Sequence, residues 1–174
     1  MAHGHCTSCP RSMAEHEDTM SIIQPQFKLM TTGLSELDAA LETIEGKYTS
    51  ITGRPGHGKT DLIITIATNA MREGHPVLFA SMEIGHRATT KRFVANFANT
   101  IHPDIDVPLQ RLGDAESLKQ EQRNALAEGV AAFDECKQHL YLVDGTKEYG
   151  GADARFVERI SAMARAITEK YGEN

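Results

Sequence analysis

The spacing of hydrophobic and polar residues predicts a mixed α/β domain that begins near Phe27. Apolar residues recur at helical spacing in several stretches, and they predict helices over 34–41, 61–72, 87–100, 117–135 and 153–171. Short β-prone or continuously apolar runs predict strands over 48–52, 77–80 and 139–143. This alternation is typical of a three-layer α/β fold with a mainly parallel sheet, in which ligands bind at the carboxyl edge of the strands.

Residues 1–26 show no such periodicity. They are polar and rich in His, Ser, Glu and Met, so we predict a poorly ordered leader followed by one domain over 27–174. Within the leader, His3, His5, Cys6 and Cys9 are suitable zinc ligands. Their spacing is too compressed for the usual arrangement of a Cys pair and a His pair, and a leader without zinc is the favoured interpretation.

Bulk composition excludes little. The 174 residues carry a net charge of −6, which gives no support for nucleic-acid binding from overall charge but leaves a local basic site open. No apolar run approaches the roughly 20 residues needed to span a bilayer, and residues 1–20 lack the apolar core of a signal peptide. We therefore expect a cytoplasmic protein without a membrane partner. Arg87, Lys91 and Arg92 form a small basic cluster, for which a solvated helix face is favoured over a nucleic-acid contact.

A glycine-rich loop between the first predicted strand and the next helix carries the clearest chemistry. It fits the phosphate-loop pattern G-x-x-x-x-G-K-[ST] at every fixed position, and its residues are Gly53, Arg54, Pro55, Gly56, His57, Gly58, Lys59 and Thr60. The glycines permit backbone conformations in which successive N–H groups hold phosphate oxygens. Lys59 supplies a positive charge for the β and γ phosphates, and the Thr60 hydroxyl is a ligand for Mg²⁺. The loop therefore predicts binding of a nucleoside triphosphate, with ATP as the expected one.

Two acidic residues follow the other predicted strands and are candidates for the remaining chemistry. Glu83 follows 77–80 and is either a general base for water or an acid that caps the next helix. Asp144 ends the run 139–143 and is either a carboxylate on the Mg²⁺ side or a turn residue. The Asp-Gly pair at 144–145 is a strong turn signal, so the turn interpretation is favoured for Asp144.

Three segments in the same order resemble RecA-type ATPases, and specifically the motor domain of DnaB-type replicative helicases. Thr32-Gly-Leu-Ser-Glu-Leu-Asp38 is similar to the segment that precedes the phosphate loop in these proteins. Gly53–Thr60 follows at the expected distance, and Ser81-Met-Glu-Ile84 resembles the Ser-Leu-Glu-Met strand end of the helicases. The resemblance covers residues 28–173, although KaiC- and RadA-like proteins share parts of it.

The resemblance implies a RecA-like fold and ATP hydrolysis coupled to DNA unwinding by a homohexamer. It implies that Glu83 is the catalytic base, with Lys59 and Thr60 in the phosphate and Mg²⁺ roles. It also disfavours a catalytic role for Asp144, because the corresponding segment is not the Walker B strand in this family. The alternative is a KaiC- or RadA-like, or degenerate, module that binds ATP without helicase activity.

The end of the chain departs from the family pattern. In the helicases the Walker B strand follows a helix that ends in Tyr-Gly, whereas this chain ends at 171–174, so we expect a domain that is incomplete on its C-terminal side. The resemblance places that strand between 48–52 and 77–81, which are then expected to be separated by a gap or to pair anew. Such a chain is expected to bind ATP weakly and not to unwind DNA. The competing hypothesis is that 139–144 takes the central position and acts as Walker B.

Overall fold

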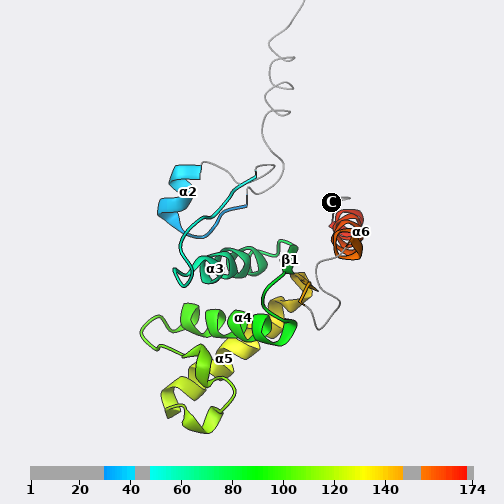
Figure 1. The fold of residues 1–174 in the computed structure, drawn as a ribbon. Coiled ribbons are helices and arrows are strands. Elements are labelled where there is room, and N and C mark those ends of the chain that lie inside the picture. The colour runs from blue at the N-terminus through cyan, green and yellow to red at the C-terminus, as the bar shows by residue number, and fades with distance from the viewer. Residues whose placement is uncertain (1–29, 42–47, 147–153, 172–174) are drawn as a thin grey trace, which may run out of the picture.

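The computed structural model describes residues 30–41, 48–146 and 154–171 (Figure 1). In chain order the main elements are α2 (Ser35–Leu41), α3 (Lys59–Arg72), β1 (Val77–Ser81), α4 (His86–Ile101), α5 (Gln120–Cys136), β2 (Leu140–Asp144) and α6 (Ala154–Tyr171). Short 3₁₀ turns occur at Leu109–Arg111, Ala115–Ser117 and Lys137–His139. The helices predicted from periodicity are confirmed to within a few residues. The predicted leader and its candidate zinc ligands lie outside the described residues.

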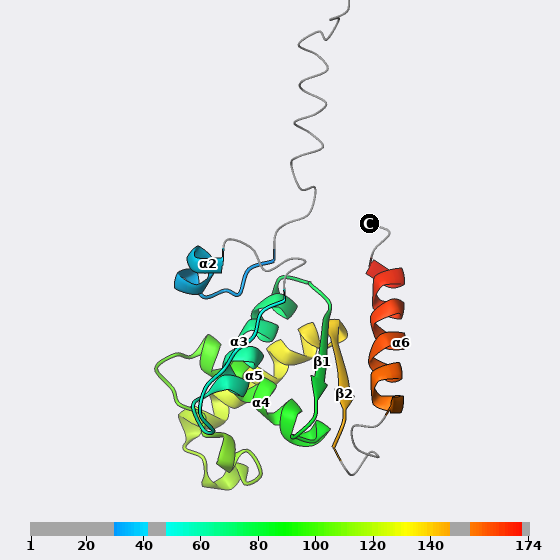
Figure 2. The same ribbon diagram turned by 45° about the horizontal axis from the view of Figure 1, so that its top comes forward.

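The elements form three layers around a small parallel sheet, which confirms the predicted fold class. Strands β1 and β2 pair in parallel, with Val77 opposite Leu140 and Ser81 opposite Asp144. Figure 2 shows α6 on one side of the two strands and α3, α4 and α5 on the other. The carboxyl ends of both strands and the N-terminal end of α3 lie at the same end of the domain in that view. This common end is where an α/β sheet is expected to bind its ligands.

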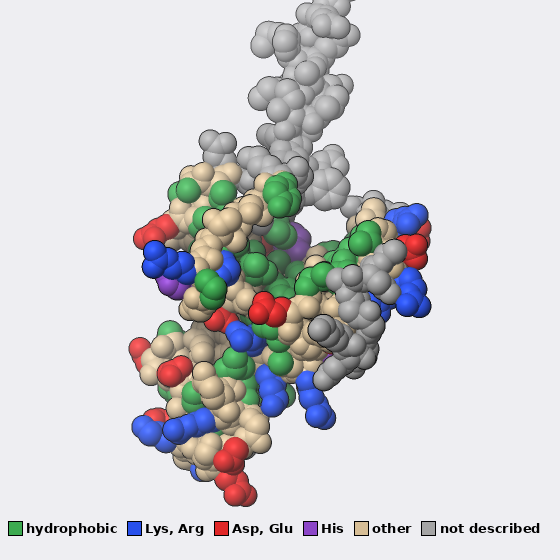
Figure 3. All heavy atoms as spheres, viewed as in Figure 1, with side chains coloured by type: hydrophobic (Ala, Val, Ile, Leu, Met, Phe, Trp, Pro, Cys, Tyr) green, Lys and Arg blue, Asp and Glu red, His purple; other side chains and the backbone are tan. Residues whose placement is uncertain are grey.

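The predicted strand over 48–52 is wrong, because these residues form no strand in the structure. A strand needs a neighbour to pair its N–H and C=O groups, and in the described sheet β1 pairs only with β2. Tyr48 is 94% exposed, so its β-prone side chain packs on nothing. The sheet also does not place 139–144 between 48–52 and 77–81, which contradicts the hypothesis of a central position. Figure 3 shows hydrophobic side chains at the hollow between α3 and α6 on this face of the domain.

The core lies between α3, α4 and α5, on the apolar faces that periodicity predicts. Its buried side chains include Ile64, Met71, Phe93, Phe97 and Phe133. The rings of Phe97 and Phe133 meet edge to face with centroids 5.8 Å apart, and Phe93 stands in the same relation to Phe79 of β1 at 5.4 Å. Aromatic pairs in this geometry add stability beyond the area they bury. The core therefore fixes the direction of α3, the helix that follows the phosphate loop.

The segment before the loop is anchored on α3 by a buried threonine. The backbone N–H and the hydroxyl of Thr32 both donate to the Oδ1 atom of Asp38, at 2.7 and 2.6 Å. The side-chain amide of Asn69, in α3, donates to the Thr32 carbonyl at 2.8 Å. Gly33 adopts a φ of 74°, a left-handed conformation that favours glycine. The Thr-Gly and Leu-Asp parts of the sequence motif thus join α2 to the helix of the loop.

Candidate functional site

The phosphate-loop residues lead directly into the N-terminus of α3. Gly56 and Gly58 have φ values of 78° and 76°, so both use the left-handed conformation that glycine permits. Gly58 is the N-cap of α3, and no side chain caps this helix end. The first N–H groups of a helix lack partners within the helix, and they carry the positive end of its dipole. The end of α3 therefore offers N–H donors to an anion at the loop.

Lys59 lies across the loop that it follows. Its Nζ atom donates to the carbonyl oxygens of Gly53 and Arg54, at 3.0 and 2.9 Å. The His57 N–H donates to the same Arg54 carbonyl at 3.3 Å, which closes the turn. The side chains of residues 53–58 are exposed, whereas Lys59 and Thr60 are half-buried at the start of the helix. The Lys59 ammonium and the N-terminus of α3 thus both lie at one small loop that is open to solvent.

Contacts between α3 and α4 hold this helix end in place. Arg92 donates to the Oδ1 atom of Asp61 at 2.7 Å, and the Asn96 amide donates to the Thr65 hydroxyl at 2.9 Å. Arg92 therefore forms an ion pair with Asp61, the residue after Thr60. The prediction that Arg92 belongs to a solvated basic cluster misses this ion pair. The interpretation of Arg87 and Lys91 as a solvated face agrees with their exposure.

Glu83 lies in a bend just after β1, as expected from the sequence. The Ser81 hydroxyl donates to the Ile84 carbonyl at 2.5 Å and accepts the Ile84 N–H at 3.3 Å, and these bonds shape the bend. The Glu83 side chain is exposed. The first N–H of α4, at His86, is bound by a different carboxylate, that of Asp144. Glu83 thus presents its carboxylate to solvent at the carboxyl end of β1.

The carboxylate that caps α4 belongs to Asp144, at the end of β2. Its Oδ2 atom accepts the His86 N–H at 2.6 Å, and its Oδ1 atom accepts the Thr146 N–H at 2.9 Å. Burial alone would raise the pKa of Asp144, but the hydrogen bonds from Thr146 and His86 outweigh it and hold the pKa below its ordinary value. Both oxygens therefore serve backbone N–H groups, which supports the turn interpretation over a magnesium role.

The cap on α4 is the functional contact that sequence reasoning missed. The Asp-Gly signal identifies the local half, the bond to Thr146, because Asp side chains commonly bind a backbone group two residues later. The bond to His86 joins segments far apart in the chain and depends on the register of β1 and β2. The Gly145 N–H, which donates to the Ser81 carbonyl at 2.7 Å, extends that register beyond the strand.

Two findings bear on the expectations for a metal site and for a membrane span. In the described part of the chain, no group of three or more His, Cys, Asp and Glu side chains is placed to hold a metal ion. Among the described helices, none is both long and apolar enough to cross a bilayer.

Comparison with known proteins agrees with the resemblance carried by the motifs. A family model described as DnaB-like helicase C terminal domain matches residues 30–170. The matched range includes the threonine anchor at Thr32, the phosphate loop, the bend with Glu83 and nearly all of α6. No curated protein and no solved structure matches the chain.

Proposed function

The chain belongs to the family of DnaB-like helicase C-terminal domains, and on this premise we propose that it binds ATP and Mg²⁺ through residues 53–60. The observation that carries the proposal is the N-terminus of α3, which no side chain caps. The loop before it contains Gly56 and Gly58 in the left-handed conformation, and the Lys59 ammonium donates to the loop carbonyl of Gly53. Backbone N–H groups and a positive charge at one helix end are what the phosphates of a nucleotide require. Thr60, the next residue, supplies the hydroxyl for Mg²⁺.

Lys59 exchanges its hydrogen-bond acceptors when the nucleotide binds. In the structure the Lys59 ammonium donates to the carbonyl oxygens of Gly53 and Arg54. On nucleotide binding the β and γ phosphates replace these neutral acceptors, and hydrogen bonds between charged groups are stronger than those to neutral acceptors. The preference of Lys59 for phosphate is thus a net gain rather than the full strength of an ion pair.

Glu83 acts as the general base that positions or activates water for hydrolysis of the γ phosphate. Its exposed carboxylate at the carboxyl end of β1, at the same end of the domain as the loop, supports this role. Asp144 takes no part, since both its oxygens bind N–H groups. For the assembled protein, the family implies a cytoplasmic homohexamer that couples ATP hydrolysis to DNA unwinding in replication. The family match does not favour the alternative of a module that binds ATP without helicase activity.

Replacement of Lys59 by alanine tests the site. We expect the affinity for Mg·ATP, measured by isothermal titration calorimetry, to fall by about 10- to 150-fold, because a hydrogen bond to a charged group contributes about 1.5–3 kcal/mol. Lys137→Ala is the matched control, since Lys137 is exposed and pairs with Asp134 far from the loop in sequence. Unchanged ATP affinity in Lys59→Ala, with normal folding by circular dichroism, would refute the site.

Replacement of Glu83 by glutamine separates catalysis from binding. Affinity for Mg·ATP is expected to stay within about twofold, while turnover falls by about 10²- to 10⁴-fold, the usual contribution of a positioned general base. Hydrolysis is measured as phosphate release under the conditions in which the wild-type protein is active. A variant with wild-type turnover would exclude Glu83 as the base and leave the binding proposal intact.

A further inference from the structure

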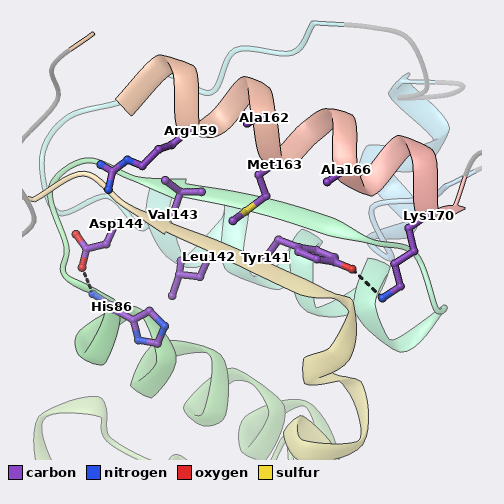
Figure 4. Close-up of a pocket in the computed structure, with 10 residues that line it drawn as sticks. All are labelled: His86, Tyr141, Leu142, Val143, Asp144, Arg159, Ala162, Met163, Ala166 and Lys170. Carbon is purple, nitrogen blue, oxygen red and sulfur yellow. Dashed lines mark hydrogen bonds between the residues drawn. The ribbon is translucent and has the colours of Figure 1, made fainter. Parts of the chain in front are cut away.

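A groove of about 700 Å³ runs between α6 and β2, away from the phosphate loop. Figure 4 shows β2 in front of β1, with α6 above the strands and α4 below them. Four consecutive residues of β2, 141–144, line the groove, and Ala162, Met163 and Ala166 line it from α6. Successive side chains of a strand point to opposite faces, so a groove that touches four in a row follows the edge of the strand rather than one face.

The backbone of β2 on this edge is unpaired in the described sheet, which contains β1 and β2 alone. The Gly145 N–H donates to Ser81 of β1, so the backbone groups of Gly145 face β1. In a parallel ladder the backbone groups of alternate residues face alternate sides. Those of Tyr141 and Val143 therefore also face β1, and those of Leu140 and Leu142 face the groove. An apolar strand edge of this kind is a template for pairing with another extended chain.

Basic side chains lie at both ends of the groove. Arg159 lines one end and Lys170 the other, as Figure 4 shows, with His86 near the Arg159 end. Lys170 donates to the Tyr141 hydroxyl at 3.1 Å, which keeps its ammonium at the rim. The single carboxylate in the lining is Asp144, and its two oxygens already accept backbone N–H groups. The groove thus combines an apolar floor, unpaired backbone groups and basic ends.

We propose that this groove binds an extended peptide segment of a partner protein, which adds to β2 as a third strand. The segment alternates apolar and polar residues and carries an acidic residue near each end, opposite Arg159 and Lys170. Its backbone pairs with Leu140 and Leu142, and its apolar side chains lie against Met163 and the two alanines of α6. Because β2 has five residues and a strand rises about 3.3 Å per residue, the paired part spans roughly 17 Å.

A synthetic peptide tests the proposal on the wild-type protein. The probe is fluorescein-labelled Glu-Val-Thr-Val-Thr-Val-Glu, and its binding to the full chain is followed by fluorescence anisotropy. Two versions carry N-methyl groups, on two of the valines or on the two threonines. Because alternate N–H groups face one neighbour, one version is expected to lose at least about tenfold in affinity and the other to bind as the parent does. Equal losses in both versions, or no binding of the parent at about 1 mM, would overturn the proposal.

Charge and edge are then tested separately. A peptide with lysine in place of both glutamates is expected to bind at least about fivefold more weakly, and equal binding of the two contradicts the role of the basic ends. Arg159→Ala is expected to weaken the glutamate peptide alone, whereas Arg165→Ala on the same helix, outside the groove lining, leaves it unchanged. A loss of the same size in both arginine variants refutes the assignment of Arg159.

Leu142→Pro removes an edge N–H of β2 and leaves the ladder to β1 intact, because proline is tolerated where its nitrogen faces away from the sheet. We expect this variant to lose peptide binding by at least about tenfold. If it fails to fold by circular dichroism, the pair of N-methylated peptides on the wild-type protein still decides. Dimers of the wild-type chain that Leu142→Pro dissolves would show that a second copy occupies the edge, and would overturn the assignment to a partner peptide.

Discussion

Replacing Gly129 with alanine sets helix propensity against packing, and the structure decides the sign. Gly129 lies inside α5, where alanine is favoured over glycine by about 1 kcal/mol in an exposed position. In the fold, however, Gly129 is buried against α4. A Cβ atom at Gly129 would lie 2.7 Å from the Cβ and 2.7 Å from the backbone nitrogen of Ala98, and 2.8 Å from its Cα. Two of these atoms are backbone, so no side-chain rotation relieves the contact.

The size of the effect follows from these two opposing contributions. Overpacking of a well-packed core costs about 1–3 kcal/mol, and contacts with helix backbone belong at the upper end because α4 itself has to move. Subtracting the gain of about 1 kcal/mol in propensity leaves a net loss of about 2 kcal/mol in the free energy of unfolding. For a chain of this size that corresponds to a fall in Tm of about 4–8 °C.

Urea denaturation followed by far-ultraviolet circular dichroism measures the change. Ala127→Gly is the matched control, because Ala127 is exposed on the same helix and reports the propensity contribution alone, a loss of about 1 kcal/mol. Gly129→Ser adds one more atom at the same contact and is expected to be at least as destabilising as Gly129→Ala. A Gly129→Ala protein as stable as the wild type, or more so, would refute the close approach of α4 and α5.

Two further predictions concern the segments that hold the site. Gly33→Ala is expected to be more destabilising than Gly74→Ala in urea denaturation. Both glycines have positive φ, so a side chain at either position costs about 1–2 kcal/mol in backbone strain. Of the two, only Gly33 has a neighbour that an added Cβ would meet, the side chain of Asn69. Equal losses would contradict the anchor. Asp144→Asn is expected to be less stable than the wild type at pH 7, since an amide presents a donor to one of two N–H groups. The pKa of Asp144 is lowered in the fold, so its contribution is present above the unfolded pKa of about 3.9 and lost as pH falls through the folded value. The two urea midpoints should converge there, and a constant difference down to acid pH counts against the two hydrogen bonds.

The helices could be predicted from the sequence because each satisfies its own backbone groups and needs only one apolar face. The face of α4, with Phe93 and Phe97 in register, was predicted and is buried in the structure. Residues 48–52 have equally suitable β-prone side chains, but their strand requires a neighbour that pattern alone cannot supply. Pairing is a property of the assembled sheet, so the error fell on the one predicted strand without a partner.

The candidate site likewise has one part that could be predicted from the sequence and another that could not. The loop follows from local chemistry, since glycine at 56 and 58 is what the observed left-handed conformations require. The bonds from Lys59 to two carbonyls within six residues are also local. The cap of α4 by Asp144 was not predictable from spacing, because it depends on where β2 pairs along β1. Nor does the sequence indicate that four successive residues of β2 would line an open edge.

The two halves of the proposed active site are held by different parts of the fold. The loop is fixed by α3, which the Thr32 anchor joins to α2. Glu83 is fixed by the bend after β1, and that bend depends on Ser81 and on the Asp144 bond to the start of α4. No described strand joins the halves. Their relative position therefore depends on the packing of α3 against α4, through the core and the pair of Asp61 with Arg92.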